Sequence, residues 1–189
     1  MTPTAGLDFT DVAEALRRVT VEITADSGAL GSGLLWPRGC VVTNAHVIRA
    51  ARVAVRLADG IRLEARLVAR DVEADLAVLR IPGSGLPAAT LANLSAARVG
   101  ALVVAVGHPF GVRGAVTAGI VHAVAPIVPG GPPWIHADVR LAPGNSGGPL
   151  AGVEGAVVGL NAMVAGGLAL AIPIARVVDF ARAAGVTPT

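Results

Sequence analysis

The stretch Pro143-Gly144-Asn145-Ser146-Gly147-Gly148-Pro149-Leu150 is the most informative part of the chain. A serine hydroxyl is a poor nucleophile unless a base removes its proton, and the oxyanion that forms next needs backbone N–H donors directed at one point. Glycines around a serine permit a tight turn and let a substrate carbonyl approach the backbone amides. The stretch therefore predicts a nucleophilic serine that is followed by a strand. The alternative interpretation is a glycine-rich turn with an incidental serine.

Two segments that precede this serine supply the partners that a nucleophile needs. His46 comes shortly after the apolar run Val41-Val42, with Thr43, Asn44 and Ala45 between them, and Asp75 directly precedes the apolar run 76–79. Taken singly, the histidine is interpreted as a hydrogen-bonded structural residue and the aspartate as a turn residue. Together with Ser146 they follow the chain order His, Asp, Ser, which is the chymotrypsin order and differs from that of α/β-hydrolases and subtilisins. The joint pattern predicts a catalytic triad.

Most of the chain alternates apolar and polar residues with the period of two that is typical of strands. Asp59-Gly60 lies between two such runs and is a two-residue hairpin signal. Helices are predicted near both ends: over 11–19, where Asp11 and Glu14 are placed like a capping box, and over 174–185, after Pro173. Strands are predicted at 20–24, 53–57, 61–67, 76–81, 102–106, 116–124, 157–160 and 168–172.

The longest segment without periodicity, residues 82–97, divides the strands into two comparable sets. We interpret it as a linker between two small β-barrels, at 20–81 and 98–173, inside one domain of residues 1–189 with a closing helix at 174–185. Many short strands separated by Gly/Pro turns indicate an all-β fold. Another Pro- and Gly-rich segment, from Ala125 to Trp134, is predicted to be a surface loop, either a plain connector or a regulatory one.

Composition excludes several classes of function. The net charge is +2, every basic residue is arginine, and two Trp and three Phe are the only aromatics, which argues against a nucleic-acid surface. The apolar runs are too short to span a membrane. Cys40 is the only cysteine, so no disulfide forms within the chain, and we interpret it as a core residue. No cluster has metal-ligand spacing, and we expect no cofactor.

The ordered motifs together resemble the HtrA/Deg branch of the chymotrypsin-fold serine proteases. The resemblance runs from about Val12 to Phe180. It implies two perpendicular six-stranded β-barrels with His46, Asp75 and Ser146 in the cleft between them. The motifs that carry it are Gly31-Ser32-Gly33, Thr43-Asn44-Ala45-His46-Val47, Ala74-Asp75-Leu76-Ala77-Val78-Leu79, Val106-Gly107-His108-Pro109-Phe110-Gly111, Thr117-Ala118-Gly119-Ile120-Val121, Gly144-Asn145-Ser146-Gly147-Gly148-Pro149-Leu150 and Ala171-Ile172-Pro173.

The resemblance also implies how the site residues act. Ser146 is expected to attack, His46 to serve as general base and Asp75 to orient it, with an oxyanion hole at Gly144, Asn145 and Ser146. Pro143 fixes one φ beside that hole. The position that selects the substrate side chain in trypsin-like enzymes holds Arg140, whereas the HtrA pattern implies an apolar pocket. Residues assigned to the pocket are Arg140, Leu141, Leu160, Asn161 and Ala162.

These assignments favour an endopeptidase that cleaves unfolded or misfolded polypeptides after small aliphatic residues. An acidic residue selected by Arg140 is the alternative. We assign His108, His122 and His136 to structural roles. Family members usually continue into PDZ domains. The given sequence ends just after the predicted closing helix, so we expect either an isolated protease domain or a natural protein without PDZ. Family trimers assemble through N-terminal segments, for which Leu7-Asp8-Phe9 is the candidate.

Two other classes of function remain to be weighed. A non-catalytic chaperone or binding module could retain the protease fold, but the intact triad argues against it. An esterase is disfavoured because its nucleophile precedes the other triad members and is followed by a helix. The N-terminus lacks the charged and apolar regions of an export signal, so we expect a cytoplasmic location, with a periplasmic or extracytoplasmic one as the alternative for a trimmed chain.

Overall fold

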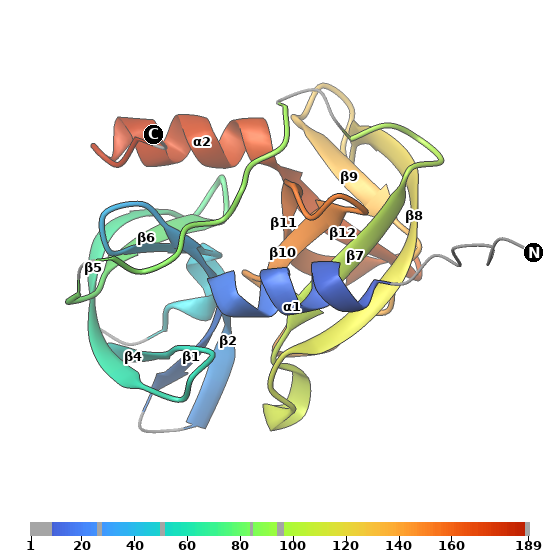
Figure 1. The fold of residues 1–189 in the computed structure, drawn as a ribbon. Helices are drawn as coiled ribbons and strands as arrows, with labels where there is room; N and C mark the ends of the chain where they lie inside the picture. The colour runs from blue at the N-terminus through green and yellow to red at the C-terminus, as the bar shows by residue number, and fades with distance from the viewer. Residues whose placement is uncertain (1–8, 26–27, 50–51, 84, 94–96, 188–189) are drawn as a thin grey trace, which may run out of the picture.

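The computed structural model describes residues 9–25, 28–49, 52–83, 85–93 and 97–187, and Figure 1 shows their arrangement. Their strands form two closed antiparallel barrels, which confirms the all-β prediction. The N-terminal barrel contains β1 (Thr20–Ala25), β2 (Gly28–Trp36), β3 (Cys40–Thr43), β4 (Val53–Arg56), β5 (Arg62–Asp71) and β6 (Leu76–Arg80). The C-terminal barrel contains β7 (Leu102–Gly107), β8 (Ala115–Pro126), β9 (Pro133–Ala137), β10 (Pro149–Gly152), β11 (Val157–Ala165) and β12 (Leu168–Pro173).

The two barrels have the same strand order. Going around the first, the neighbours are β1-β2-β3-β6-β5-β4, and around the second they are β7-β8-β9-β12-β11-β10. Closing each sheet on itself pairs every strand on both edges, which satisfies backbone N–H and C=O groups that an open edge would leave exposed. The shared topology is not visible as an internal sequence repeat, because many different apolar residues fill a barrel interior.

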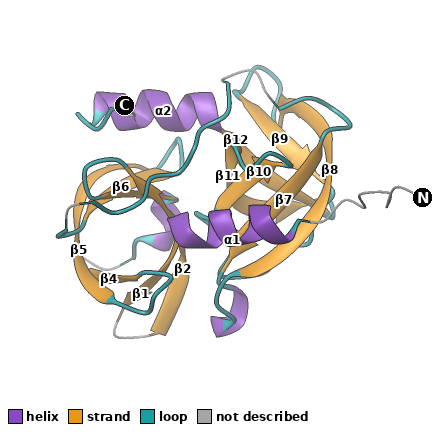
Figure 2. Cartoon of the chain, viewed as in Figure 1, coloured by secondary structure: helices purple, strands orange, loops and turns teal. Residues whose placement is uncertain are grey.

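Helices α1 and α2 lie outside the barrels (Figure 2), and each packs against both of them. Helix α1 (Thr10–Val19) packs against β1 and β7, and helix α2 (Ile174–Ala183) packs against β11, β12 and β6. Each helix therefore contacts strands of both barrels. Helix α1 buries Ala13, Leu16 and Val19, which lie on one face at helical spacing. No helix in the described part of the chain is long and apolar enough to cross a membrane.

The ends of the helices differ in how well the sequence predicted them. Helix α1 has Phe9 at its N-cap position with no side-chain capping bond, so the predicted capping box of Asp11 and Glu14 is wrong. The helix begins one residue earlier than expected, which places Asp11 inside the first turn. Helix α2 ends at Ala183, and Gly185 terminates it as predicted. The φ of Gly185 is +75°, and the Val186 amide donates to the Ala181 carbonyl at 2.8 Å. This is the Schellman geometry that favours glycine.

The predicted strand ranges did not include β2, and they differ from the structure between β8 and β9. Pro126 pairs with Pro133 and Ala125 with Trp134, so the ends of the predicted surface loop are strand. Prolines are tolerated there because the ladder needs no N–H from them at its last pair. The connection that remains, residues 127–132, is mostly exposed. Strand β9 (Pro133–Ala137) was not expected, since its apolar residues Trp134 and Ile135 are adjacent and do not alternate with polar ones.

The larger of the two buried apolar clusters extends from one barrel into the other. One buried cluster fills the N-terminal barrel and continues through Leu160 and Ile172 to Val177 of α2. A second, smaller cluster lies inside the C-terminal barrel around Ile135, Leu150 and Val158. The continuous cluster fixes the barrels against each other, because separating them would expose apolar surface to water. A site built from both barrels can therefore have a defined geometry.

Candidate active site

His46 lies in the 3₁₀ turn η1 (Ala45–Val47), directly after β3. Its ring Nδ1 lies 2.9 Å from Asp75 Oδ2 and 3.0 Å from Oδ1, and its backbone N–H donates to Oδ1 at 3.0 Å. A carboxylate only accepts, so the ring proton sits on Nδ1 and leaves Nε2 as the accepting nitrogen. The His46 side chain is 42% exposed and that of Asp75 15%, so a ligand can reach the imidazole while the carboxylate is shielded.

Asp75 adopts an unusual backbone conformation, with φ at +54°. Its carbonyl accepts a hydrogen bond from Asn44 Nδ2 at 3.0 Å, and the amide of Ala74 donates to Asp71 Oδ1 at 2.9 Å. Aspartate tolerates this left-handed region better than most residues, although the conformation still costs energy. The contacts on both sides hold the turn before β6 in the shape that directs the Asp75 carboxylate at His46.

The turn that contains Ser146 requires glycine at two positions. Gly144 has φ +109° and Gly147 φ +85°. A Cβ on Gly144 would collide with the His108 carbonyl, and one on Gly147 with the Ser32 carbonyl and Thr43 Oγ1. The Gly147 amide donates to the Asn161 carbonyl at 2.8 Å, which ties the turn to β11. The glycines thus serve close packing as well as backbone freedom.

Strand β2 brings the serine turn and the histidine turn together. The Ser32 amide donates to the Ser146 carbonyl at 2.8 Å. At the neighbouring Gly31, a Cβ would lie 2.9 Å from the methyls of Val47 and 3.1 Å from that same carbonyl. Val47 directly follows His46, so both turns lie against one short piece of β2. Ser146 Oγ donates to the Ala162 carbonyl at 2.8 Å, and no hydrogen bond joins it to His46 among the described residues.

The backbone amides around Ser146 are not equivalent. The Asn145 amide donates to the Ala142 carbonyl at 3.0 Å and is therefore engaged within the turn. The amides of Gly144 and Ser146 have no acceptor within the described residues. Of the three residues predicted for an oxyanion hole, Gly144 and Ser146 therefore have amides that a ligand could use, and Asn145 does not.

A pocket of about 470 Å³ opens beside Ser146. Of the five residues predicted to line it, it contains Leu141 and Ala162. Leu160 and Asn161 are completely buried and lie outside the lining, as does the exposed Arg140. The amide group of Asn161 instead donates to the Pro149 carbonyl at 2.8 Å. The pocket residues are Leu141, Ala142, Pro143, Asn145, Ser146, Ala162, Met163 and Val164.

A bulge in β11 explains why Met163 and Val164, which were not predicted, line the pocket. Asn161 pairs with Ala171 and Met163 with Leu170, so Ala162 is an extra residue in the ladder. A bulge moves the alternation of side chains by one position. Met163 and Val164 consequently reach the pocket, where they are 42% and 52% exposed. The sequence carried no signal for this irregularity.

The other histidines were predicted to be structural. His122 is exposed, and His136 Nε2 lies 3.1 Å from the Ala125 carbonyl. His108 is different, because it is buried beside the serine turn with Nδ1 3.0 Å from Ser32 Oγ. Burial, assisted by the charge of Arg113, lowers the pKa of His108 from 6.5 to about 4. Neither its position nor the role of Ser32 was recognised from the sequence.

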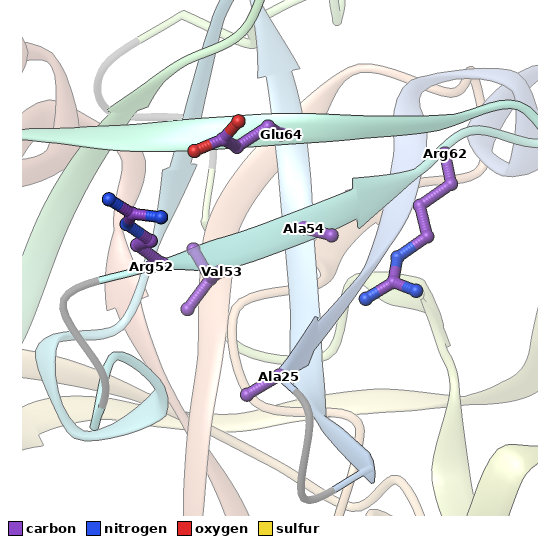
Figure 3. A pocket seen from close by; sticks show the side chains of 6 residues that line it. All are labelled: Ala25, Arg52, Val53, Ala54, Arg62 and Glu64. Atoms are coloured by element: carbon purple, nitrogen blue, oxygen red, sulfur yellow. The ribbon is translucent and has the colours of Figure 1, made fainter.

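Another hollow lies away from the triad residues. Figure 3 shows this hollow on the N-terminal barrel, where Arg52, Arg62 and Glu64 extend from the region of β4 and β5, with Ala25 at the end of β1. Polar and apolar residues line it equally, and no residue of the serine turn is among them. In the described part of the chain, no group of three or more His, Cys, Asp or Glu side chains has the geometry to hold a metal ion.

Comparison with known proteins agrees with this geometry. The family described as trypsin-like peptidase domain matches residues 31–160. A probable periplasmic serine endoprotease, DegP-like, from Pseudomonas savastanoi pv. phaseolicola is 43% identical over 167 residues, covering 83% of this chain and 35% of the relative. One of the same description from Halomonas elongata is 41% identical over 163 residues, covering 81% of this chain and 34% of the relative.

A solved structure shows the same fold. The HtrA-type protease AlgW with a decapeptide superposes with a TM-score of 0.83 at 28% identity, covering 92% of this chain and 66% of that one. The chain spans about a third of the length of the curated relatives it matches.

Proposed function

This chain belongs to the trypsin-like peptidase family, and within it to the HtrA/DegP type, and on that premise we propose that it is a serine endopeptidase. The observation that carries the proposal is the bidentate contact of His46 Nδ1 with both Asp75 oxygens, at 2.9 and 3.0 Å, next to a serine turn with two unengaged amides. Such an arrangement suits acyl transfer to a hydroxyl.

The reaction begins when Ser146 Oγ attacks the carbonyl carbon of a bound peptide. His46 Nε2 accepts the hydroxyl proton and later donates it to the leaving amine. Asp75 keeps the proton of His46 on Nδ1 and stabilises the imidazolium. The amides of Gly144 and Ser146 donate to the oxyanion. Water then attacks the acyl-enzyme. His46 Nε2 accepts a proton from the water and donates it to Ser146 Oγ as the ester bond breaks.

One movement must precede the attack. Ser146 Oγ rests on the Ala162 carbonyl at 2.8 Å, and its proton is therefore directed away from His46. Rotation about one side-chain bond redirects the hydroxyl, at a cost of one hydrogen bond to a backbone carbonyl, about 1 kcal/mol. Catalytic hydrogen bonds often form only when substrate binds, so this resting position is compatible with an active enzyme.

The pocket supports a preference for small aliphatic side chains before the scissile bond. Its walls are apolar at Leu141, Ala162, Met163 and Val164, and Arg140 does not line it. An apolar cavity has no group to pair with a buried carboxylate, so acidic side chains would bind poorly. A panel of peptides that vary only at this position tests the preference, and faster cleavage after Glu or Asp than after Val or Ala would refute it.

The proposal extends to substrate, assembly and location. Polypeptides in an unfolded or misfolded state are the expected substrates, since an extended chain can bring a side chain into the pocket beside Ser146. A homotrimer remains a prediction, because Leu7 and Asp8 of the candidate contact lie outside the described residues. The curated relatives are named periplasmic, which favours an extracytoplasmic location and does not support the cytoplasmic one.

A fluorophosphonate probe, which reacts with activated serines, tests the enzymatic function directly. The unaltered chain should label and should hydrolyse casein between pH 6 and 9, and Ser146→Ala should do neither. The comparison also tests the non-catalytic alternative, since a binding module would bind unfolded polypeptides without cleaving them both as the unaltered chain and as Ser146→Ala. An unaltered chain that neither labels nor hydrolyses casein would refute the proposal.

A further inference from the structure

Ser32 connects the two barrels at the serine turn. It lies in β2 of the N-terminal barrel, which Figure 1 labels, and its hydrogen bonds reach the serine turn that precedes β10. Its amide donates to the Ser146 carbonyl at 2.8 Å, and its hydroxyl donates to the Gly144 carbonyl at 2.7 Å. The side chain and the backbone of this one residue thus hold the carbonyls on both sides of Asn145.

The hydroxyl of Ser32 has three polar neighbours, and together they determine which nitrogen of the His108 ring carries the proton. Ser32 Oγ lies 2.7 Å from the Gly144 carbonyl, 3.1 Å from the His108 amide nitrogen and 3.0 Å from His108 Nδ1. The carbonyl can only accept, so the single hydroxyl proton points there, and the amide can only donate. All three contacts are then satisfied only if Nδ1 carries the ring proton and donates to Ser32.

The neighbouring backbone extends this support to the oxyanion amides. The Phe110 amide donates to the Pro143 carbonyl at 3.3 Å, and the His108 amide approaches the Gly144 carbonyl at 3.3 Å. The Pro143–Gly144 peptide is trans, so fixing its carbonyl also fixes the direction of the Gly144 N–H. The segment 108–110 and Ser32 therefore hold the peptide planes on both sides of Gly144.

We propose that His108 and Ser32 are a positioning pair, in which a proton on His108 Nδ1 directs the Ser32 hydroxyl to the Gly144 carbonyl and so keeps the Gly144 and Ser146 amides aimed at the oxyanion. This inference rests on the proposed peptidase function. Neither residue touches the reacting atoms. Burial keeps the imidazole neutral at working pH, since its pKa is lowered to about 4.

The test uses two substitutions of similar size at position 108. The side chain of His108→Asn can place an amide donor where Nδ1 was, since that atom is separated from Cα by the same number of bonds. His108→Leu has nearly the same shape as Asn but no donor. Loss of an oxyanion donor costs roughly 10²- to 10³-fold in kcat. We expect His108→Leu to lose at least about tenfold in kcat at nearly constant KM, and His108→Asn to stay within about threefold of the unaltered enzyme.

A double-substitution cycle separates positioning from general stability. If the imidazole acts through the Ser32 hydroxyl, His108→Leu should have almost no further effect on kcat in a Ser32→Ala background. The matched control is His136→Leu, which also removes a hydrogen-bonded imidazole, in this case one that contacts the Ala125 carbonyl away from the serine turn. It should leave kcat unchanged. Losses in kcat that simply multiply would overturn the proposal, as would a His108→Leu enzyme within about threefold of the unaltered one.

A spectroscopic measurement keeps the inference testable if the peptidase activity itself fails. Nitrogen-15 NMR signals of the His108 ring at pH 7 should show Nδ1 protonated and Nε2 bare. Relative to Ser146→Ala, the amide signals of Gly144 and of the residue at position 146 should move in Ser146→Ala/His108→Leu and stay in place in Ser146→Ala/His108→Asn. A ring proton on Nε2 would refute the pair whatever the activity, whereas an inactive but correctly protonated protein would refute only the peptidase function.

Discussion

The burial of His108 makes the stability of this protein dependent on pH in a way that one substitution should remove. The His108 side chain is 6% exposed, and its pKa is lowered from 6.5 to about 4. An unfolded chain would restore the ordinary value, so between these limits the unfolded state binds a proton that the folded state excludes. Stability from this histidine is therefore complete above pH 6.5 and is lost as the pH falls towards 4.

The size of the effect follows from the two pKa values. A tenfold difference in proton affinity between the folded and unfolded states corresponds to about 1.4 kcal/mol. The complete loss therefore amounts to roughly 3 kcal/mol, of which roughly 2 kcal/mol falls between pH 7 and pH 5. His108→Asn removes the titrating group while keeping a side chain that hydrogen-bonds. Over this interval the free energy of unfolding should fall by roughly 2 kcal/mol more in the unaltered protein than in His108→Asn.

Urea denaturation at pH 7, 6 and 5, at constant ionic strength, measures this difference. Tryptophan fluorescence reports it, because Trp36 and Trp134 are both buried, one in each barrel. Carboxylates that titrate in the same range are common to both proteins and cancel in the comparison. His122→Asn is the control, because that side chain is exposed, and it should follow the unaltered protein. Parallel stability curves for the unaltered protein and His108→Asn would refute the reasoning.

Three further substitutions probe the site and the core. Asp75→Asn should keep the fold but lower kcat by roughly 10³- to 10⁴-fold, because the amide no longer keeps the His46 proton on Nδ1; a small change in peptide hydrolysis would contradict the assigned role. Gly147→Ala should give little labelling by a fluorophosphonate, since its Cβ would collide with Ser32 and Thr43 at a φ of +85°, and normal labelling would show that the turn can relax. Leu150→Ala, completely buried in the smaller core, should cost about 2–5 kcal/mol in urea unfolding, and a loss below about 1 kcal/mol would contradict its packing.

The sequence predicted those features that depend on residue type and local spacing. Period-two alternation and the Asp59-Gly60 turn indicated strands and a hairpin, and β4 and β5 pair on either side of that turn. Gly185 ended α2 because a left-handed residue is needed there whatever surrounds it. The segments with His46, Asp75 and Ser146 stood out because nucleophile chemistry restricts the residues that can carry it.

Features that depend on contacts between distant segments could not be predicted in the same way. Where Met163 and Val164 lie relative to the pocket depends on the bulge that precedes them, because one extra residue in a ladder exchanges the faces of all residues that follow. The capping box failed because docking of α1 across both barrels, and not its first turn alone, determines where the helix begins.

By itself, the sequence determined the all-β class and the residue types on which an acyl transfer depends, because alternation and reactive side chains are local properties. Only the tertiary structure decided how those groups are held. Ser32 and Gly144 are 112 positions apart in the chain, and their hydrogen bond exists because two closed barrels share a buried interface. The direction of the hydroxyl, and with it the orientation of the serine turn, depends on a buried imidazole from a third segment, which no local pattern encodes.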